Sequence, residues 1–234
     1  RRIDDSAIEC AGHFEEYLAS YPDSRFIADV LVRLAQLYYD IDNLQHSERQ
    51  AAAGIDEYVA EDYSRSVELY QQILTEYSGS EVEDVAFYSL GYCLESMMDF
   101  EGAVENYRNL LQSYPESDLA AECNIRVGNF YFDILEYDSA LVYFQNILDY
   151  PDASPNLYQH GLYKLGWTQY LTKDFRQSVA TFAYLLRDDQ TIDSLGIQRR
   201  GDIRILNEAR EYIAYDFLEM HDMSADAVPV AVSF

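Results

Sequence analysis

The residues best suited to metal binding or nucleophilic catalysis are four histidines and three cysteines, and their spacing favours neither chemistry. They are scattered along the chain as His13, His46, His160, His221, Cys10, Cys93 and Cys123. A metal site or a redox pair would need ligands a few residues apart, as in Cys-x-x-Cys or a histidine pair on one helix face. The cysteines instead fit small buried residues of helical packing. We therefore expect no metal and no disulfide framework.

The sequence also lacks the motifs that hold a phosphate group or activate a serine. It contains no Gly-rich phosphate loop and no Gly-x-Ser-x-Gly turn. Carboxylates are abundant, but no spacing among them singles out a catalytic pair. We therefore expect a protein that is not an enzyme and takes no cofactor. An enzyme or a carbohydrate-binding protein is the remoter alternative.

The net charge restricts the partners of this chain. It carries 42 Asp and Glu against 16 Lys and Arg, a formal net charge of −26. Nucleic acid and anionic lipid both require a basic patch, so neither is expected to bind. A basic protein partner is favoured instead, with an association that weakens as salt rises. The same charge also fits a surface adapted to high salt, and that alternative stays open. No apolar stretch reaches the roughly eighteen residues of a membrane span.

An aromatic residue preceded by an acid recurs at a fixed interval. Phe100, Tyr137 and Phe175 are separated by 37 and 38 residues. The same intervals connect Leu90-Gly91, Val127-Gly128 and Leu165-Gly166. A fixed period in this range indicates one supersecondary unit that is stacked several times. Stacked helical units offer binding surfaces more often than reaction centres, which directs the question of function toward protein surfaces.

Each unit is expected to contain two antiparallel helices. In residues 84–116, apolar residues recur at i, i+3, i+4 and i+7 spacing, with an interruption at Met98-Asp99. Pro115 ends the second stretch, because proline disfavours a helical residue before it. Small residues, Gly91 and Ala103, fall on the two facing helices and permit their close approach.

These residues carry a resemblance to a known family. Leu90-Gly91, Ala103, Tyr107 and Pro115 stand at the relative spacings of the tetratricopeptide repeat, and the two following units resemble it as well. The resemblance implies an all-α fold, a right-handed α-α superhelix or solenoid of antiparallel helix pairs. The chain departs from the family at Asn124, which replaces the usual aromatic residue, and at Ser178, which replaces alanine. The third unit lacks the closing proline, and the intervals exceed the usual 34 residues.

The repeat register predicts the organisation of the whole chain. It divides into the second helix of a truncated N-terminal repeat, a repeat with an insertion at about 41–62, three regular repeats, and an insertion with a partial repeat helix and a tail. The corresponding ranges are 1–25, 26–79, 80–116, 117–153, 154–190 and 191–234. The insertion at 41–62 is either a helical extension or a loop. Since both ends read as truncated repeats, we expect the sequence to be a fragment.

The joints between units carry a weaker resemblance. They are variants of one Tyr-Pro-acid-Ser turn, at Tyr21, Tyr77, Tyr114 and Tyr150. Such turns are similar to those of tetratricopeptide proteins of the bacterial cell envelope, of the outer-membrane assembly lipoprotein and Tol-Pal-associated types. The resemblance implies a periplasmic or cell-envelope location, with the cytoplasm as the alternative.

The resemblance also implies a peptide-binding groove on the inner face of the first helices. In the three regular units it assigns to this groove Tyr88, Tyr92, Glu95, Asn129, Phe132, Tyr163, Trp167 and Tyr170. The outer first helices would add Asp29, Val32, Gln36 and Tyr39, then Glu208, Glu211 and Tyr215. Rings flanked by carboxylates suit Arg and Lys side chains through cation–π contacts and charge pairing. The alternative is that these rings pack only against neighbouring helices.

We therefore predict a non-enzymatic protein–protein interaction scaffold that binds a basic or amphipathic segment of a protein partner. The competing hypothesis is an assembly subunit that contacts its neighbours through residues 41–62, 188–206 and the tail 225–234. Self-association is compatible with either hypothesis.

Overall fold

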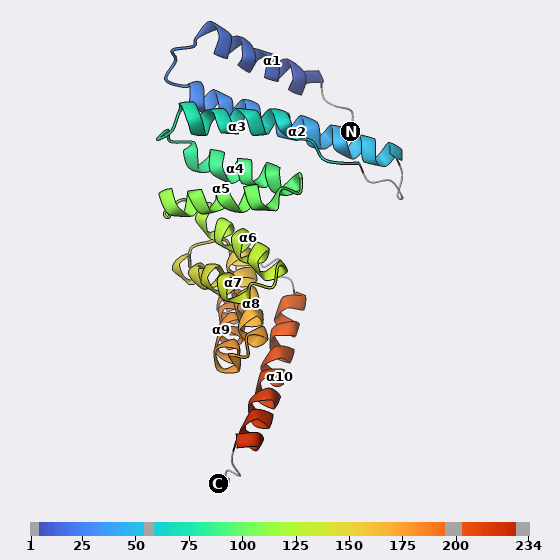
Figure 1. The fold of residues 1–234 in the computed structure, drawn as a ribbon, viewed down its shortest axis with the longest axis vertical. Helices are drawn as coiled ribbons and strands as arrows, with labels where there is room; N and C mark the ends of the chain where they lie inside the picture. The colour runs from blue at the N-terminus through green and yellow to red at the C-terminus, as the bar shows by residue number, and fades with distance from the viewer. Residues whose placement is uncertain (1–4, 54–58, 195–202, 228–234) are drawn as a thin grey trace. The chain divides into compact units, whose positions relative to one another are not determined.

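Every regular element in the described part of the computed structural model is a helix (Figure 1). The structure describes residues 5–53, 59–194 and 203–227. Its elements are α1 (Asp5–Ser20), α2 (Ile27–Ala53), α3 (Ser64–Glu76), α4 (Glu83–Ser96), α5 (Phe100–Ser113), α6 (Ala120–Asp133), α7 (Tyr137–Gln145), the 3-10 turn η1 (Asn146–Asp149), α8 (Pro155–Leu171), α9 (Phe175–Ser194) and α10 (Ile203–Ala227). The predicted all-α class with helices packed in consecutive antiparallel pairs is confirmed.

The helices form two compact units, residues 1–123 and 124–234, which we describe separately. In the first unit each helix from α1 to α5 packs against the next one along the chain. In the second unit, α7 packs against α8, α8 against α9, and α9 against α10. No described helix is both long and apolar enough to cross a bilayer.

The turn that joins the two helices of a unit has the same geometry in three places. Met98, Leu135 and Lys173 adopt φ angles of 67°, 65° and 65°. In each turn the N–H of the next residue donates to a carbonyl five residues earlier, as Asp99 N–H does to Leu94 C=O at 2.8 Å. The N–H of the left-handed residue itself donates to a carbonyl three residues earlier, as Met98 N–H does to Glu95 C=O. This pairing defines the Schellman motif, which normally places glycine at the left-handed position.

The acid that precedes each aromatic residue connects the two helices. Its N–H closes the Schellman motif of the first helix, and in two turns its carboxylate caps the second helix. Asp99 accepts a hydrogen bond from Gly102 N at 3.0 Å, and Asp174 accepts one from Gln177 N at 3.3 Å. The second helices α5, α7 and α9 accordingly begin at the three recurrent aromatic residues. Because one acid both closes the first helix and caps the second, which starts at the ring, the acid and the ring recur together in the sequence.

Replacing the left-handed residue by glycine should stabilise the fold. Leu135 is 69% exposed, so its side chain contributes little packing, while its φ of 65° is unfavourable for any residue with a Cβ. We expect Leu135→Gly to raise the free energy of unfolding of the second unit by about 1 kcal/mol. Urea titration followed by Trp167 fluorescence measures this change. Leu135→Ala is the matched control and should give no gain, and equal effects of the two substitutions would contradict the explanation.

A small residue on each first helix receives an aromatic ring from its second helix. A Cβ built on Gly91 would lie 2.7 Å from the Tyr107 ring, and one on Gly128 would lie 2.5 Å from Phe144. The same pairing recurs in the third unit between Gly166 and the ring of Phe182. These rings are at most 1% exposed. The Leu-Gly dipeptides of the sequence are therefore sites of direct helix contact.

The Tyr-Pro-acid-Ser joints form hydrogen-bonded turns, and one of them is fixed by a buried carboxylate. In all four joints an N–H three residues after the tyrosine bonds to the tyrosine carbonyl. Glu83 accepts hydrogen bonds from Gly79 N, Ser78 Oγ and Tyr114 Oη. Burial raises the pKa of Glu83, but these three bonds outweigh it and hold the pKa below the ordinary range.

The predicted insertion at 41–62 begins as a helical extension. Helix α2 continues through residues 41–53, and 54–58 lie outside the described residues. The chain then returns along α2, where Val59 bonds through its carbonyl to His46 at 2.8 Å and through its N–H to Gln50 at 2.9 Å. At the other insertion, α9 extends to Ser194 and α10 begins at Ile203. Residues 195–202 and the tail 228–234 lie outside the described part of the chain.

Candidate functional site

The predicted groove residues lie on α4, α6 and α8, the first helices of the three regular units. Because the chain forms two compact units, they separate into two sets. Tyr88, Tyr92 and Glu95 belong to the first unit. The second unit contains Asn129, Phe132, Tyr163, Trp167 and Tyr170. Each set has its own geometry, and their role in binding remains a prediction.

In the first unit the tyrosines form a continuous chain of ring contacts, which we call the tyrosine chain. Its members, in order of contact, are Tyr63, Tyr39, Tyr92, Tyr88 and Tyr107, with successive ring centroids 4.6, 5.8, 6.4 and 5.9 Å apart. Tyr63 and Tyr107 are buried at its ends, while the other three are half-buried. The sequence predicted Tyr39, Tyr88 and Tyr92 on one face, and the structure brings their rings together.

Carboxylates accept hydrogen bonds from the tyrosine chain. Tyr88 Oη donates to Glu122 at 2.7 Å, and Tyr107 Oη donates to Glu95 at 2.8 Å. Burial, with the hydrogen bond to Tyr92, raises the pKa of Tyr39 far above its ordinary value, so its phenol stays protonated. Two rings of the tyrosine chain are therefore held in place by carboxylates through their hydroxyl groups. Glu95, predicted as a ligand contact, already has a partner within its own unit.

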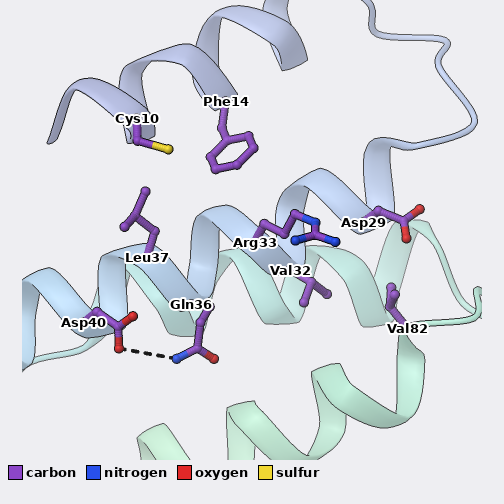
Figure 2. A pocket seen from close by; sticks show the side chains of 9 residues that line it. All are labelled: Cys10, Phe14, Asp29, Val32, Arg33, Gln36, Leu37, Asp40 and Val82. Carbon is purple, nitrogen blue, oxygen red and sulfur yellow. Dashed lines mark hydrogen bonds between the residues drawn. The ribbon is translucent and has the colours of Figure 1, made fainter. Parts of the chain in front are cut away.

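An open pocket lies beside α2, which is the first helix of its repeat unit (Figure 2). Its volume is about 510 Å³. Three of the four inner-face residues predicted on α2 line it, namely Asp29, Val32 and Gln36. Figure 2 shows Cys10 and Phe14 of α1 pointing into the same space. The pocket mixes apolar side chains with the carboxylates of Asp29 and Asp40, and it also contains the cation Arg33.

In the second unit, rings from α6, α8 and α10 form what we call the tryptophan cluster: Phe132, Tyr163, Trp167, Tyr170 and Tyr212. The Trp167 centroid lies 4.9 Å from Phe132, 6.0 Å from Tyr163 and 6.4 Å from Tyr212. Tyr170 joins the cluster through Tyr212, and the centroids of these two rings lie 5.2 Å apart. The sequence reasoning did not include Tyr212, although its place on the partial repeat helix could have suggested it.

Lys164 places its ammonium group against this cluster. Its Nζ lies 4.8 Å from the ring centroid of Phe132 and 5.6 Å from that of Trp167. Both distances are within the range of a cation–π contact. Burial lowers the pKa of Lys164, and the charge of Asp133 offsets part of that effect. We predicted that these rings would contact a cation of a ligand. In this structure the cation against them is Lys164 of the chain itself.

The exposure of the predicted residues decides which of them a partner can reach. Phe132 and Tyr163 are only 9% and 8% exposed, and Tyr163 donates its hydroxyl proton to Glu208 of α10. These two side chains therefore support the surface from beneath. Trp167 and Tyr170 stay half-buried and accessible. Asn129 is half-buried too, and its Oδ1 atom has no hydrogen-bond partner among the described residues.

Within the described ranges, no group of three or more His, Cys, Asp or Glu side chains is arranged to hold a metal ion. Cys93 and Cys123 are buried thiols, in agreement with their expected role in packing. Cys10 is exposed, contrary to that expectation, because it lines the open pocket between α1 and α2.

Comparison with known proteins identifies the repeat. A model of the tetratricopeptide repeat matches residues 85–117 and 160–189. Among solved structures, MamA is similar with a TM-score of 0.56 and 14% identity, over 79% of this chain and 89% of that one. The C-terminal part of a TPR repeat-containing protein from Cytophaga hutchinsonii is similar with a TM-score of 0.51 and 12% identity, over 91% of this chain and 74% of that one. At these identities the likeness concerns the fold. None of the curated proteins compared with the chain matches it.

Proposed function

Because two segments of this chain match the tetratricopeptide repeat and its fold is that of repeat proteins, we propose that it is a non-enzymatic scaffold that binds a basic or amphipathic segment of a partner protein. Repeats of this type generally mediate protein–protein interaction or scaffolding. The binding residues would be the accessible rings of the inner face, Tyr88 and Tyr92 in the first unit and Trp167 and Tyr170 in the second.

The observation that carries this proposal is the contact of Lys164 with the tryptophan cluster. An ammonium group already rests 4.8 Å from Phe132 and 5.6 Å from Trp167, so the surface has the geometry and chemistry to hold a cation. In the first unit the tyrosine chain offers the same combination of rings and acids, with Glu122 beside Tyr88. The net charge of −26 adds long-range attraction for a basic segment.

A designed peptide tests the proposal without knowledge of the natural partner. The probe is an amphipathic helical peptide with Arg and Lys along its polar face, and the matched probe carries Gln at those positions. We expect the basic peptide alone to bind, with an affinity that falls about tenfold or more between low and high salt. Tyr92→Ala combined with Trp167→Ala should weaken binding by about 30-fold or more, because partly buried aromatic residues are the usual hot spots. Isothermal titration calorimetry measures both effects.

Two further variants, a control and a variant expected to bind more tightly, complete the experiment. Tyr21→Ala removes a tyrosine that is 59% exposed at a joint outside the inner face, and it should leave the affinity unchanged. Lys164→Gln removes the internal cation and should strengthen binding at the tryptophan cluster. Equal binding of the basic and Gln peptides, or an unchanged affinity of the double variant with its helical content intact, would refute the proposed site.

A further inference from the structure

Another open groove lies in the first unit, between α1 and α3, on a side of α2 that the inner face does not use. None of the residues assigned to the inner face lines it. Ile27, Leu31 and Leu34 of α2 form its floor, and all three are buried. Leu18 of α1 and Leu69 of α3 form its walls. We call this space, with a volume of about 590 Å³, the outer groove.

The outer groove is bounded by three consecutive helices, and both α1 and α3 pack on α2. In the repeat register, an element before α1 would be a first helix, and it would stand to α3 as α2 stands to α5. Among the described helices, α2 packs against α1, α3 and α4 but not against α5. A first helix before α1 would therefore not reach α3, and it would leave the outer groove open.

The corresponding positions of the next repeat are polar where the outer groove is apolar. Ile27 corresponds to Glu83, whose carboxylate accepts three hydrogen bonds from its own unit. Leu69 corresponds to Asn106, whose side-chain amide donates to a backbone carbonyl of its own helix at 2.8 Å. The repeat fold can therefore be built with polar residues at both positions. The apolar lining of the outer groove is a property of this one repeat, and packing of the fold does not require it.

The charged residues around the outer groove leave its mouth negative. Glu15 and Glu68 line it and are exposed. Glu15 accepts a hydrogen bond from Tyr38. Arg65 also lines the groove, but its guanidinium pairs with Asp42 and lies 4.4 Å from the ring centroid of Tyr38, so its charge is already compensated within the unit. Three carboxylates against one guanidinium favour an occupant that carries positive charge.

We propose that the outer groove is a second binding site, which takes a large apolar side chain flanked by Arg or Lys on a segment of a partner protein. The apolar side chain enters between Leu18 and Leu69, and a flanking basic residue pairs with Glu68 at the mouth. The volume of about 590 Å³ is within the range of about 300–1,000 Å³ that ligand pockets occupy. Because the groove is open, a small molecule would stay partly exposed in it, whereas a protein segment covers its own anchor from outside.

A short peptide followed by leucine-methyl NMR tests the proposal on the whole chain. The probe is a capped Gly-Ser-Arg-Phe-Arg-Ser-Gly peptide, and two matched probes carry Ala in place of Phe or Gln in place of both Arg. We expect the first probe to shift the methyl signals of Leu18, Leu31 and Leu69, and each matched probe to bind about tenfold or more weakly. Absence of these shifts, or equal binding of either matched probe, would overturn the proposal. Shifts that grow with protein concentration without peptide would overturn it in favour of a second copy of the chain.

Variants of the chain locate the binding. Leu69→Asn should weaken it about tenfold or more with helical content unchanged, whereas Leu148→Asn, at a leucine 42% exposed in the second unit, should not. Glu68→Gln leaves the apolar lining intact and should weaken binding about two- to fivefold, and Glu48→Gln, exposed on α2 outside the groove, should not. An unchanged affinity of Leu69→Asn would contradict the proposal.

The outer groove and the inner face can be told apart, because they share no residue. Tyr92→Ala combined with Trp167→Ala should leave binding of the short peptide unchanged. Loss of binding in that double variant would place the peptide on the inner face and refute the outer groove, without touching the function proposed above.

Discussion

Phe144→Ala is expected to lower the free energy of unfolding of the second unit by about 3–5 kcal/mol. The Phe144 ring is fully buried in a core cluster with Phe132, Ala140 and Leu165. It also lies directly over Gly128, where a Cβ would approach to 2.5 Å. Removing the ring therefore leaves a cavity between two helices and costs both the transfer free energy and the lost contacts. Urea titration monitored by Trp167, the sole tryptophan and a residue of this unit, measures the change.

A double-mutant cycle separates the specific pairing from general loss of core volume. In the natural chain, Gly128→Ala should cost about 1–3 kcal/mol because the new methyl group meets the ring. In the Phe144→Ala background the same substitution should instead stabilise, because the methyl group then fills part of the cavity. A cost of equal size in both backgrounds would show that the glycine is needed for a reason other than the ring.

Asp216→Asn is expected to stabilise the second unit by about 2 kcal/mol at pH 8 and to have little effect at pH 4. Asp216 is fully buried where α10 packs on α9, and neither of its carboxylate oxygens has a hydrogen-bond partner within the described residues. Burial raises the pKa of Asp216 to about 6, and the Ser178 hydroxyl, which lies near the carboxylate without reaching hydrogen-bond geometry, lowers it in part. The folded state therefore binds this proton more tightly than the unfolded chain.

The direction of the pH dependence follows from that difference in proton binding. Between about pH 4 and pH 6 the folded chain keeps the proton that the unfolded chain has lost, so stability decreases as pH rises. Above about pH 6 the penalty is constant. Thermal unfolding of the natural chain and of Asp216→Asn across this range should give curves that meet at low pH and diverge toward high pH.

A second variant tests the cause of the Asp216 effect. Thr168 holds the corresponding position in α8 and donates its hydroxyl proton to the Lys164 carbonyl at 2.7 Å. Asp216→Thr can satisfy its hydroxyl in the same way, so it should also stabilise at pH 8. Curves that stay parallel at all pH values would exclude the carboxyl group as the source of the pH dependence.

The sequence was sufficient to predict the repeat, the helix pairs and the starts of the second helices. It succeeded because the acid that precedes Phe100 has a local function, closing one helix and capping the next, and local hydrogen bonding repeats with the sequence. The small residues of the Leu-Gly dipeptides were predictable for a similar reason. A residue that lies directly against a ring has to be small, because a Cβ there would come too close to the ring.

The candidate site was less accessible to sequence reasoning. The register assigned Phe132 and Tyr163 to the inner face, but it does not determine how far neighbouring helices cover them. The contact of Lys164 with two rings was not predicted, because it depends on the path of a long side chain.

The position of Lys164 also has a consequence for selectivity. An ammonium group fixed to the same unit is a tethered competitor, with an effective concentration of about millimolar or higher. A free amine or a single lysine would have to compete with this tethered group, which would weaken its apparent affinity for the cluster. A segment that adds further contacts, such as several basic residues or an apolar helix face, gains more free energy for displacing it. If the tryptophan cluster binds a basic segment as proposed, Lys164 would favour extended partners over small cations.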